Sequence, residues 1–460
     1  MAKATVILAM FARHLDIQEI LISLRVLDTL RSMELLIISI FVLGYAVIAF
    51  EHQLKINKAA GALLTGVLCW TAYVLFAPSK DIVSEELTHH LGNLSGILFF
   101  LMGAMTIVEL IDAHDGFEVI TSRITTTSKR KLLWIISLLT FFLAAVLDNL
   151  ATAIVMASVT RKLLADKKER MFFVGLIVVA ANAGGAWSPI GDVTTTMLWI
   201  GGQITTGNII MKLFVPSLIC LVVPLTAVSF IMKGKVKRPA DETSSSGPRL
   251  SSGFERSMVF FSGVSLLLLV PVFKTLTHLP PYMGILLALG ILWVMTELIH
   301  HKKDESEKNY LSVAHALRKI DVSSILFFLG ILIAVSALES THLLVRLAQA
   351  MDQKIGNQSV IVICIGLLSA IVDNVPIVAA TMGMYDLKAF PPDSYLWEFI
   401  AYAAGTGGSI LIIGSAAGVA VMGIEKIDFF WYLRKIGWLA ALGYFAGAAA
   451  YMLQEHFLHL

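Results

Sequence analysis

Residues 144–152 read AAVLDNLAT and residues 369–377 read SAIVDNVPI, so an Asp-Asn pair interrupts an apolar run twice in the chain. Two more pairs of segments recur in the same order: SGILFFLMG from Ser95 with SSILFFLGI from Ser323, and GGAWSPIGD from Gly184 with GGSILIIGS from Gly407. The partners lie 228, 225 and 223 residues apart (323−95, 369−144 and 407−184). Offsets this constant indicate an internal duplication, because chance likeness among apolar segments would not keep its spacing.

The composition around these segments is typical of a membrane protein. Of the 460 residues, 57% are hydrophobic and 15% are charged, whereas a soluble domain is about 45–50% apolar. Apolar runs of about 15 to 28 residues alternate with short polar loops, and one crossing of the lipid needs about 20 residues of helix. The sequence therefore predicts an all-α polytopic membrane protein.

The duplication divides the chain into two predicted repeats, residues 33–232 and 257–460. Between them, residues 233–256 read KGKVKRPADETSSSGPRLSSGFER and predict a flexible linker, and residues 1–32 predict an N-terminal segment lying at the membrane interface. In each repeat, the runs before and after Asp-Asn are short for separate crossings, which predicts one re-entrant hairpin beside about five transmembrane helices. An odd number of crossings makes the second repeat inverted relative to the first.

The distribution of Lys and Arg between the two faces agrees with this topology. Most of the 35 Lys and Arg residues fall on the face that carries the linker, and the positive-inside tendency makes that face cytoplasmic. We therefore expect a multi-pass protein of the cell inner membrane with residues 233–256 in the cytoplasm. The formal net charge is only +2 and the basic residues form no single stripe, which argues against a nucleic-acid partner. The three cysteines are isolated and predict neither a disulfide framework nor a metal cage, and we expect no cofactor.

The Gly184 and Gly407 segments predict a broken helix in each repeat. The run 172–199 is about 28 residues long, too long for one straight crossing, and holds Gly and Pro in its middle. Unwound backbone at such a break frees carbonyl oxygens, which are the ligands that a hard cation prefers. The polar side chains that we place at the two breaks are Asn182, Ser188, Asp192 and Thr195 in the first repeat and Thr406, Ser409 and Ser415 in the second.

Asp148, Asp192 and Asp373 are the carboxylates that we predict to bind the ion and the proton. A charged side chain inside a membrane costs about 2.5–3.5 kcal/mol on insertion scales, so such residues are functional candidates. The alternative is that each Asp caps the helix that follows it, although capping and ion binding can coexist. Asp192 matches the neutral Ser415 in the other repeat, and this asymmetry could give one half the charge-carrying role.

We predict that Na⁺ contacts Asp148, Asn149, Asp192 and Asp373, with Asn374 and Thr152 beside them. For Thr152 and for Thr194, Thr195 and Thr196, helix capping or packing is the alternative, although one hydroxyl would suit the shell of a Na⁺ ion. Glu109 is surrounded by apolar residues and is a candidate proton relay, with a place at the membrane interface as the alternative.

The segments LDNLATAIVMASV from Leu147 and NAGGAWSPIGDVTTTMLWIGGQIT from Asn182 resemble the signature segments of NhaD-type Na⁺/H⁺ antiporters of the ion transporter superfamily. The resemblance runs from Met33 to the C-terminus. It implies inverted repeats, re-entrant hairpins and a homodimer. Dicarboxylate carriers of that superfamily have Ser-Asn-Thr at the hairpin tips, where this chain has Asp148-Asn149-Leu150 and Asp373-Asn374-Val375. This departure weakens the hypothesis that the substrate is an anion.

These observations predict a secondary transporter that exchanges Na⁺, and Li⁺ as a similar ion, for H⁺ by alternating access. One rival is an anion carrier for a dicarboxylate or arsenite. No Lys or Arg occurs at residues 144–158, 182–208 or 369–383, where a dicarboxylate would want one. A second rival is an intramembrane aspartyl protease with two carboxylates as an acid/base pair, but such an enzyme would need neither the Asn neighbours nor the glycine-rich breaks.

Overall fold

The computed structural model describes residues 32–458, apart from residues 49, 78, 237, 239–250 and 302. The predicted N-terminal segment 1–32 therefore lies almost wholly outside the described residues, as does the middle of the predicted linker. The chain forms two compact units. The first consists of the described residues of Met1–Gly92 with Leu326–Arg346, and the second consists of Asn93–Ile325 with Leu347–Leu460.

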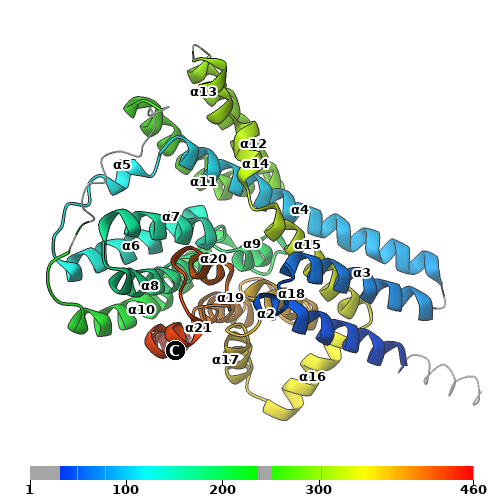
Figure 1. The fold of residues 1–460 in the computed structure, drawn as a ribbon. Coiled ribbons are helices and arrows are strands. Elements are labelled where there is room, and N and C mark those ends of the chain that lie inside the picture. The colour runs from blue at the N-terminus through cyan, green and yellow to red at the C-terminus, as the bar shows by residue number, and fades with distance from the viewer. Residues whose placement is uncertain are drawn as a thin grey trace, which may run out of the picture. The chain divides into compact units, whose positions relative to one another are not determined.

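The described part of the chain is helical and contains no β-strand, which confirms the predicted all-α class (Figure 1). Nine helices in it are long and apolar enough to cross a membrane. They are α3 (Lys58–Phe76), α4 (Lys80–Ala113), α6 (Lys129–Leu147), α8 (Lys167–Ala186), α10 (Thr206–Ile231), α11 (Gly253–Thr277), α12 (Pro281–His300), α15 (Val322–Ser340) and a continuous helix, Phe429–Phe457, built from α21 (Phe429–Tyr432), the π-helical turn η1 (Leu433–Gly437) and α22 (Trp438–Leu458).

The remaining helices are shorter. Six of them lie at the hairpins and breaks: α7 (Asn149–Leu163), α9 (Val193–Ile200), α17 (Gln358–Leu368), α18 (Asn374–Met384), α19 (Tyr395–Gly407) and α20 (Ala416–Glu425). The others are Ser32–Ile48, α2 (Glu51–Leu54), α5 (Glu118–Thr121), α13 (Glu305–Tyr310), α14 (Val313–Lys319) and α16 (Leu343–Ile355).

In the first unit, α3 packs closely on the part of α15 that belongs to it. A Cβ atom on Gly66 would lie 2.6 Å from the carbonyl oxygen of Gly330, so only glycine allows this approach. The indole of Trp70 donates a hydrogen bond of 2.9 Å to the carbonyl of Ile333.

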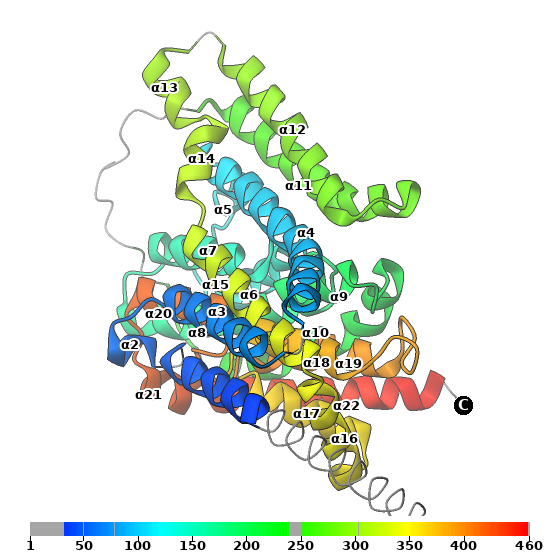
Figure 2. The ribbon, with the colours of Figure 1, turned by 90° about the vertical axis from the view of Figure 1, so that its right-hand side faces the viewer.

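In the second unit, α8 and α19 form the most enclosed layer. Every residue from Phe173 to Ala186 and from Leu396 to Gly407 is buried. Helices α6 and α10 pack on α8, α17 packs on α19, and α22 lies beside α10. Helices α11 and α12 lie side by side (Figure 2), and α11 also contacts α6. By contrast, large apolar side chains such as Phe230 and Leu298 are about 70% exposed, as expected of helices that face lipid.

Both Asp-Asn pairs lie at junctions between two helices that the sequence predicts as hairpin tips. Asp148 alone joins α6 to α7, and α17 leads through a short turn to Asp373 and α18. Helix α6, the first helix of the first predicted hairpin, is longer than predicted. Ser128 caps its N-terminus, so that it begins at Lys129 and has 19 residues, enough to cross a membrane by itself. The predicted linker is shorter at its end, because α11 begins at Gly253 with a capping box between Ser252 and Glu255.

Both predicted helix breaks are present. In the first repeat α8 ends at Ala186 and α9 begins at Val193, and in the second α19 ends at Gly407 and α20 begins at Ala416. The two breaks use the same close approach: a Cβ on Gly185 would lie 2.5 Å from the oxygen of Gly191, and one on Gly408 would lie 2.5 Å from that of Gly414. Similar backbone geometry at both breaks agrees with the duplication. The inverted orientation of the repeats remains a prediction.

Candidate ion-binding site

The candidate site is centred on the carboxylate of Asp192, which caps α9 and is 1% exposed. Its Oδ1 accepts bonds of 2.9 Å from both the backbone N–H and the hydroxyl of Thr194. Its Oδ2 accepts a bond of 2.5 Å from Nδ2 of Asn149 and one of 3.2 Å from Nδ2 of Asn374. The residues that follow Asp148 and Asp373 at the two predicted hairpin tips therefore meet on one buried carboxylate.

Asn182 extends this network to the second helix break. Its Oδ1 accepts a bond of 3.0 Å from Asn149, and its Nδ2 donates bonds of 2.9 Å to the hydroxyls of Ser409 and Ser415. We call these six residues (Asp192, Asn149, Asn182, Asn374, Ser409 and Ser415) the Asp192 cluster. Each of them is at most 4% exposed, so the cluster joins both repeats in the interior of the second unit.

Asp148 lies at the edge of the Asp192 cluster. Its Oδ1 caps α7 by accepting a bond of 2.8 Å from the N–H of Ala151. A cavity of about 10 Å³, the space of roughly one water molecule, lies between Asp148 and Asp192 and is otherwise lined by Thr196 and apolar side chains. The backbone of Asp148 has φ 77° and ψ 158°, a conformation that is rare outside glycine and that tends to occur at functional sites.

Asp373 is the third predicted carboxylate and is 9% exposed. It caps α18 through a bond of 3.4 Å from the N–H of Val375. Both Asp148 and Asp373 interact electrostatically with Asp192. All three aspartates therefore cap helices, as the alternative interpretation predicts, and all three also lie at or beside the Asp192 cluster.

The predicted hydroxyl ligands divide into two groups. Ser409 and Ser415 belong to the Asp192 cluster, whereas Ser188, Thr195 and Thr406 donate to backbone carbonyls: those of Ala145 at 2.5 Å, Asp192 at 2.9 Å and Tyr402 at 2.6 Å. Such hydroxyls keep lone pairs that can still accept a cation. The hydroxyl of Thr152 is buried and has no hydrogen-bond partner within the described part of the chain.

The roles of Thr195 and Glu109 stay predictions. The hydroxyl of Thr194 donates to the Asp192 carboxylate, whereas that of Thr195 donates to the backbone carbonyl of Asp192. An N-cap accepts from the backbone N–H two or three positions on, so the spacing from Asp192 fits both Thr194 and Thr195 and does not select between them. Glu109 makes no hydrogen bond to the Asp192 cluster in the described structure and lies 3.7 Å from the Nζ of Lys319.

The electrostatics of the site favour a bound cation or proton. Within the ranges that the structure describes, no Lys, Arg or His forms an ion pair with Asp148 or Asp192. The donors to Asp192 are amides, a hydroxyl and a backbone N–H, which orient the carboxylate without neutralising it. A carboxylate that is buried without a counter-charge is costly and therefore gains from taking up a small cation or a proton.

Interrupted helices that meet at a buried, acidic, oxygen-rich site in a multi-pass helical protein define the class of secondary membrane transporters. Comparison with known sequences gives the family. The profile of the citrate transporter family (CitMHS) matches residues 45–397, and the chain belongs to this family as an NhaD-type transporter. The resemblance that the two signature segments predicted is thereby confirmed.

Three relatives illustrate the relationship. Sodium/proton antiporter 1 of Arabidopsis thaliana is 52% identical over 424 residues, which cover 91% of this chain and 72% of the relative. Sodium/proton antiporter 2 of the same plant is 48% identical over 91% of this chain and 99% of the relative. The Na⁺/H⁺ antiporter NhaD of Vibrio cholerae is 29% identical over 91% of each chain. Family and relatives alike carry transporter names.

Proposed function

We propose that this protein exchanges Na⁺ for H⁺ across a membrane, with the ion and the proton competing for the carboxylate of Asp192. The observation that carries this proposal is the burial of Asp192 among neutral donors from both predicted hairpin tips. The names of the relatives support the same exchange.

Competition follows from the charge of the site. A protonated Asp192 is neutral and has lost its attraction for Na⁺, whereas Na⁺ beside an ionised Asp192 raises the cost of adding a proton. One carboxylate therefore does not hold both at once. Asp148, across the small cavity from Asp192, supplies a second carboxylate oxygen for an ion there. Asp373 adds negative charge nearby and favours the cation-loaded or protonated state.

The finer features of the transporter belong to the same proposal. Movement of the hairpin-bearing helices would open the Asp192 cluster to each side in turn, and Li⁺ would bind as another small hard cation. Glu109, near Lys319 at the end of α4, would pass protons. The protein would act as a homodimer in the inner membrane with residues 233–256 in the cytoplasm.

Purified protein in liposomes tests the proposal. A Na⁺ gradient should drive proton movement in the wild type, and Asp148→Asn, Asp192→Asn and Asp373→Asn should each impair it. Normal Na⁺-driven proton movement in Asp192→Asn would contradict competition at Asp192, and normal movement in all three variants would contradict the whole assignment. Because the family is named for a citrate carrier, citrate uptake is measured in the same liposomes. Uptake of citrate without Na⁺/H⁺ exchange would favour the anion-carrier alternative.

A further inference from the structure

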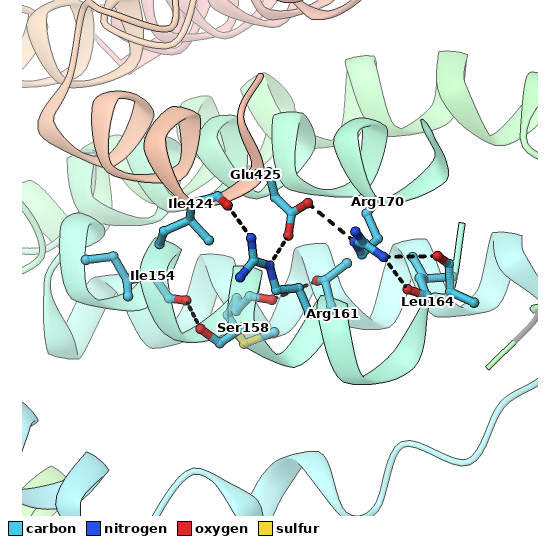
Figure 3. A network of polar contacts seen from close by, with 10 residues as sticks. Ile154, Ser158, Arg161, Leu164, Arg170, Ile424 and Glu425 are labelled. Carbon is cyan, nitrogen blue, oxygen red and sulfur yellow. Dashed lines mark hydrogen bonds and ion pairs between the residues drawn. The ribbon is translucent and has the colours of Figure 1, made fainter. Parts of the chain in front are cut away.

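Glu425 is another buried carboxylate of the second unit, remote in sequence from the aspartates of the candidate site. It is the last residue of α20 and its side chain is 1% exposed. One oxygen accepts from Nε of Arg161 and the other accepts a bond of 3.3 Å from Nε of Arg170 (Figure 3). A single carboxylate thus joins α20 to the end of α7 and the beginning of α8.

Both arginines also bind backbone carbonyls around Glu425. Arg161 donates to the carbonyl of Ile424, the neighbour of Glu425 (Figure 3). Arg170 donates bonds of 3.1 and 3.0 Å to the carbonyls of Leu164 and Ala165 in the turn between α7 and α8. Planar guanidinium groups with several engaged donors fix geometry more firmly than a single exposed ion pair does. We call Arg161, Arg170 and Glu425 the arginine clamp.

Each helix in the arginine clamp also carries a residue of the Asp192 cluster. Helix α7 holds Asn149, 12 residues before Arg161, and α8 holds Asn182, 12 residues after Arg170. Helix α20 begins at its cap, Ser415, 10 residues before Glu425. At 1.5 Å per residue these separations are about 18, 18 and 15 Å. Stretches of similar length in three packed helices therefore run from the clamp to the candidate site.

We propose that Glu425 is a positioning residue for the ion site: through the arginine clamp it fixes α7, α8 and α20 relative to one another. It thereby fixes the positions of Asn149, Asn182 and Ser415 in the Asp192 cluster. This inference rests on the function proposed above. Glu425 does not touch the ion; it acts through the three helices. Helices are stiff along their axes, so a shift of one helix at the clamp moves its residue at the Asp192 cluster.

Kinetics of Na⁺/H⁺ exchange in liposomes test the clamp. Glu425→Gln keeps the size of the side chain and removes its charge. We expect the half-saturating Na⁺ concentration to rise about tenfold, a change of the size that residues outside a binding site impose. Fewer folded molecules would lower the maximal rate alone, so a rise in the half-saturating concentration separates positioning from loss of protein.

Glu455→Gln is the matched control. Glu455 is also buried, at 6% exposure, and pairs with Lys212 at 2.6 Å, but it lies on α22, which carries no residue of the Asp192 cluster. We expect its half-saturating Na⁺ concentration to stay within about twofold of wild type, since an ion pair elsewhere should not shift the site.

An unchanged half-saturating Na⁺ concentration in Glu425→Gln, or an equal rise in Glu455→Gln, would overturn the clamp. If Glu425→Gln is not recovered from membranes, Arg161→Gln, at the half-exposed partner, is judged by the same criterion. Measuring transport by Asp192→Asn distinguishes failure of the proposed ion site from failure of the arginine clamp. An active Asp192→Asn refutes the ion site, whereas an inactive Asp192→Asn with a normal Glu425→Gln refutes only the clamp.

Discussion

Replacing Asp192 with Asn is the change for which the structure gives the largest expected effect. The substitution keeps the shape of the side chain but removes the charge that Asn149, Asn374 and Thr194 surround. A Na⁺ ion about 2.4 Å from a carboxylate oxygen would gain roughly 7 kcal/mol at an effective dielectric constant of about 20. Even if relaxation and water offset half of this, about 3 kcal/mol remains, which is at least a hundredfold loss of Na⁺ affinity.

The assay is Na⁺-induced proton movement in everted vesicles, followed with a pH-sensitive dye over a wide range of Na⁺ concentrations. At ten times the half-saturating Na⁺ concentration of the wild type, Asp192→Asn should give no more than about a tenth of the maximal response, because a hundredfold weaker site is then almost empty. Asp166→Asn is the control, because Asp166 also caps a helix, α8, through the N–H of Glu169 but lies outside the Asp192 cluster. A normal response from Asp192→Asn, with the protein present at wild-type levels, would refute the reasoning.

Three further changes have expected outcomes. Asn149→Ala removes a donor to both Asp192 and Asn182, and hydrogen bonds to charged groups contribute about 1.5–3 kcal/mol; the half-saturating Na⁺ concentration in liposomes should rise at least tenfold. Gly185→Ala forces a Cβ against the backbone of Gly191 and should lower the free energy of unfolding in detergent by about 1–3 kcal/mol. Gly290→Ala is the control and should leave it unchanged, because a Cβ on Gly290 meets nothing within 4 Å. Acidification should raise the half-saturating Na⁺ concentration by up to about tenfold per pH unit once Asp192 begins to bind protons, because the proton removes the anionic form that Na⁺ needs; a flat Na⁺ dependence across pH 5–9 would contradict competition.

The breaks and the Asp-Asn junctions were predictable from the sequence because each violates a strong local rule. Gly and Pro within a long apolar run interrupt a helix wherever it lies, and a carboxylate within such a run needs a special reason. Asp148, Asp192 and Asp373 therefore stood out, and the duplication placed their neighbours at equivalent positions. The coarse fold followed from hydropathy alone, since only helices satisfy their backbone groups within each segment in lipid.

The contacts between distant parts of the chain were not predictable in the same way. Asn182 bridges to Ser409 and Ser415 across 227 and 233 residues, and Glu425 meets Arg161 and Arg170 across 264 and 255 residues. In the sequence, Glu425 resembles an ordinary polar residue at the end of an apolar run, and it is the packing of α20 against α7 and α8 that buries it. The choice of Thr194 over Thr195 depended on the phase of α9 at its first turn, which a run of three threonines does not reveal.

Proton release on Na⁺ binding tests the central claim most directly. When Na⁺ is added to purified, weakly buffered wild-type protein at a pH where Asp192 is partly protonated, we expect protons to be released in proportion to the Na⁺ bound, and we expect none from Asp192→Asn. Na⁺ binding by the wild type without proton release, or equal release from Asp192→Asn, would contradict competition at this carboxylate.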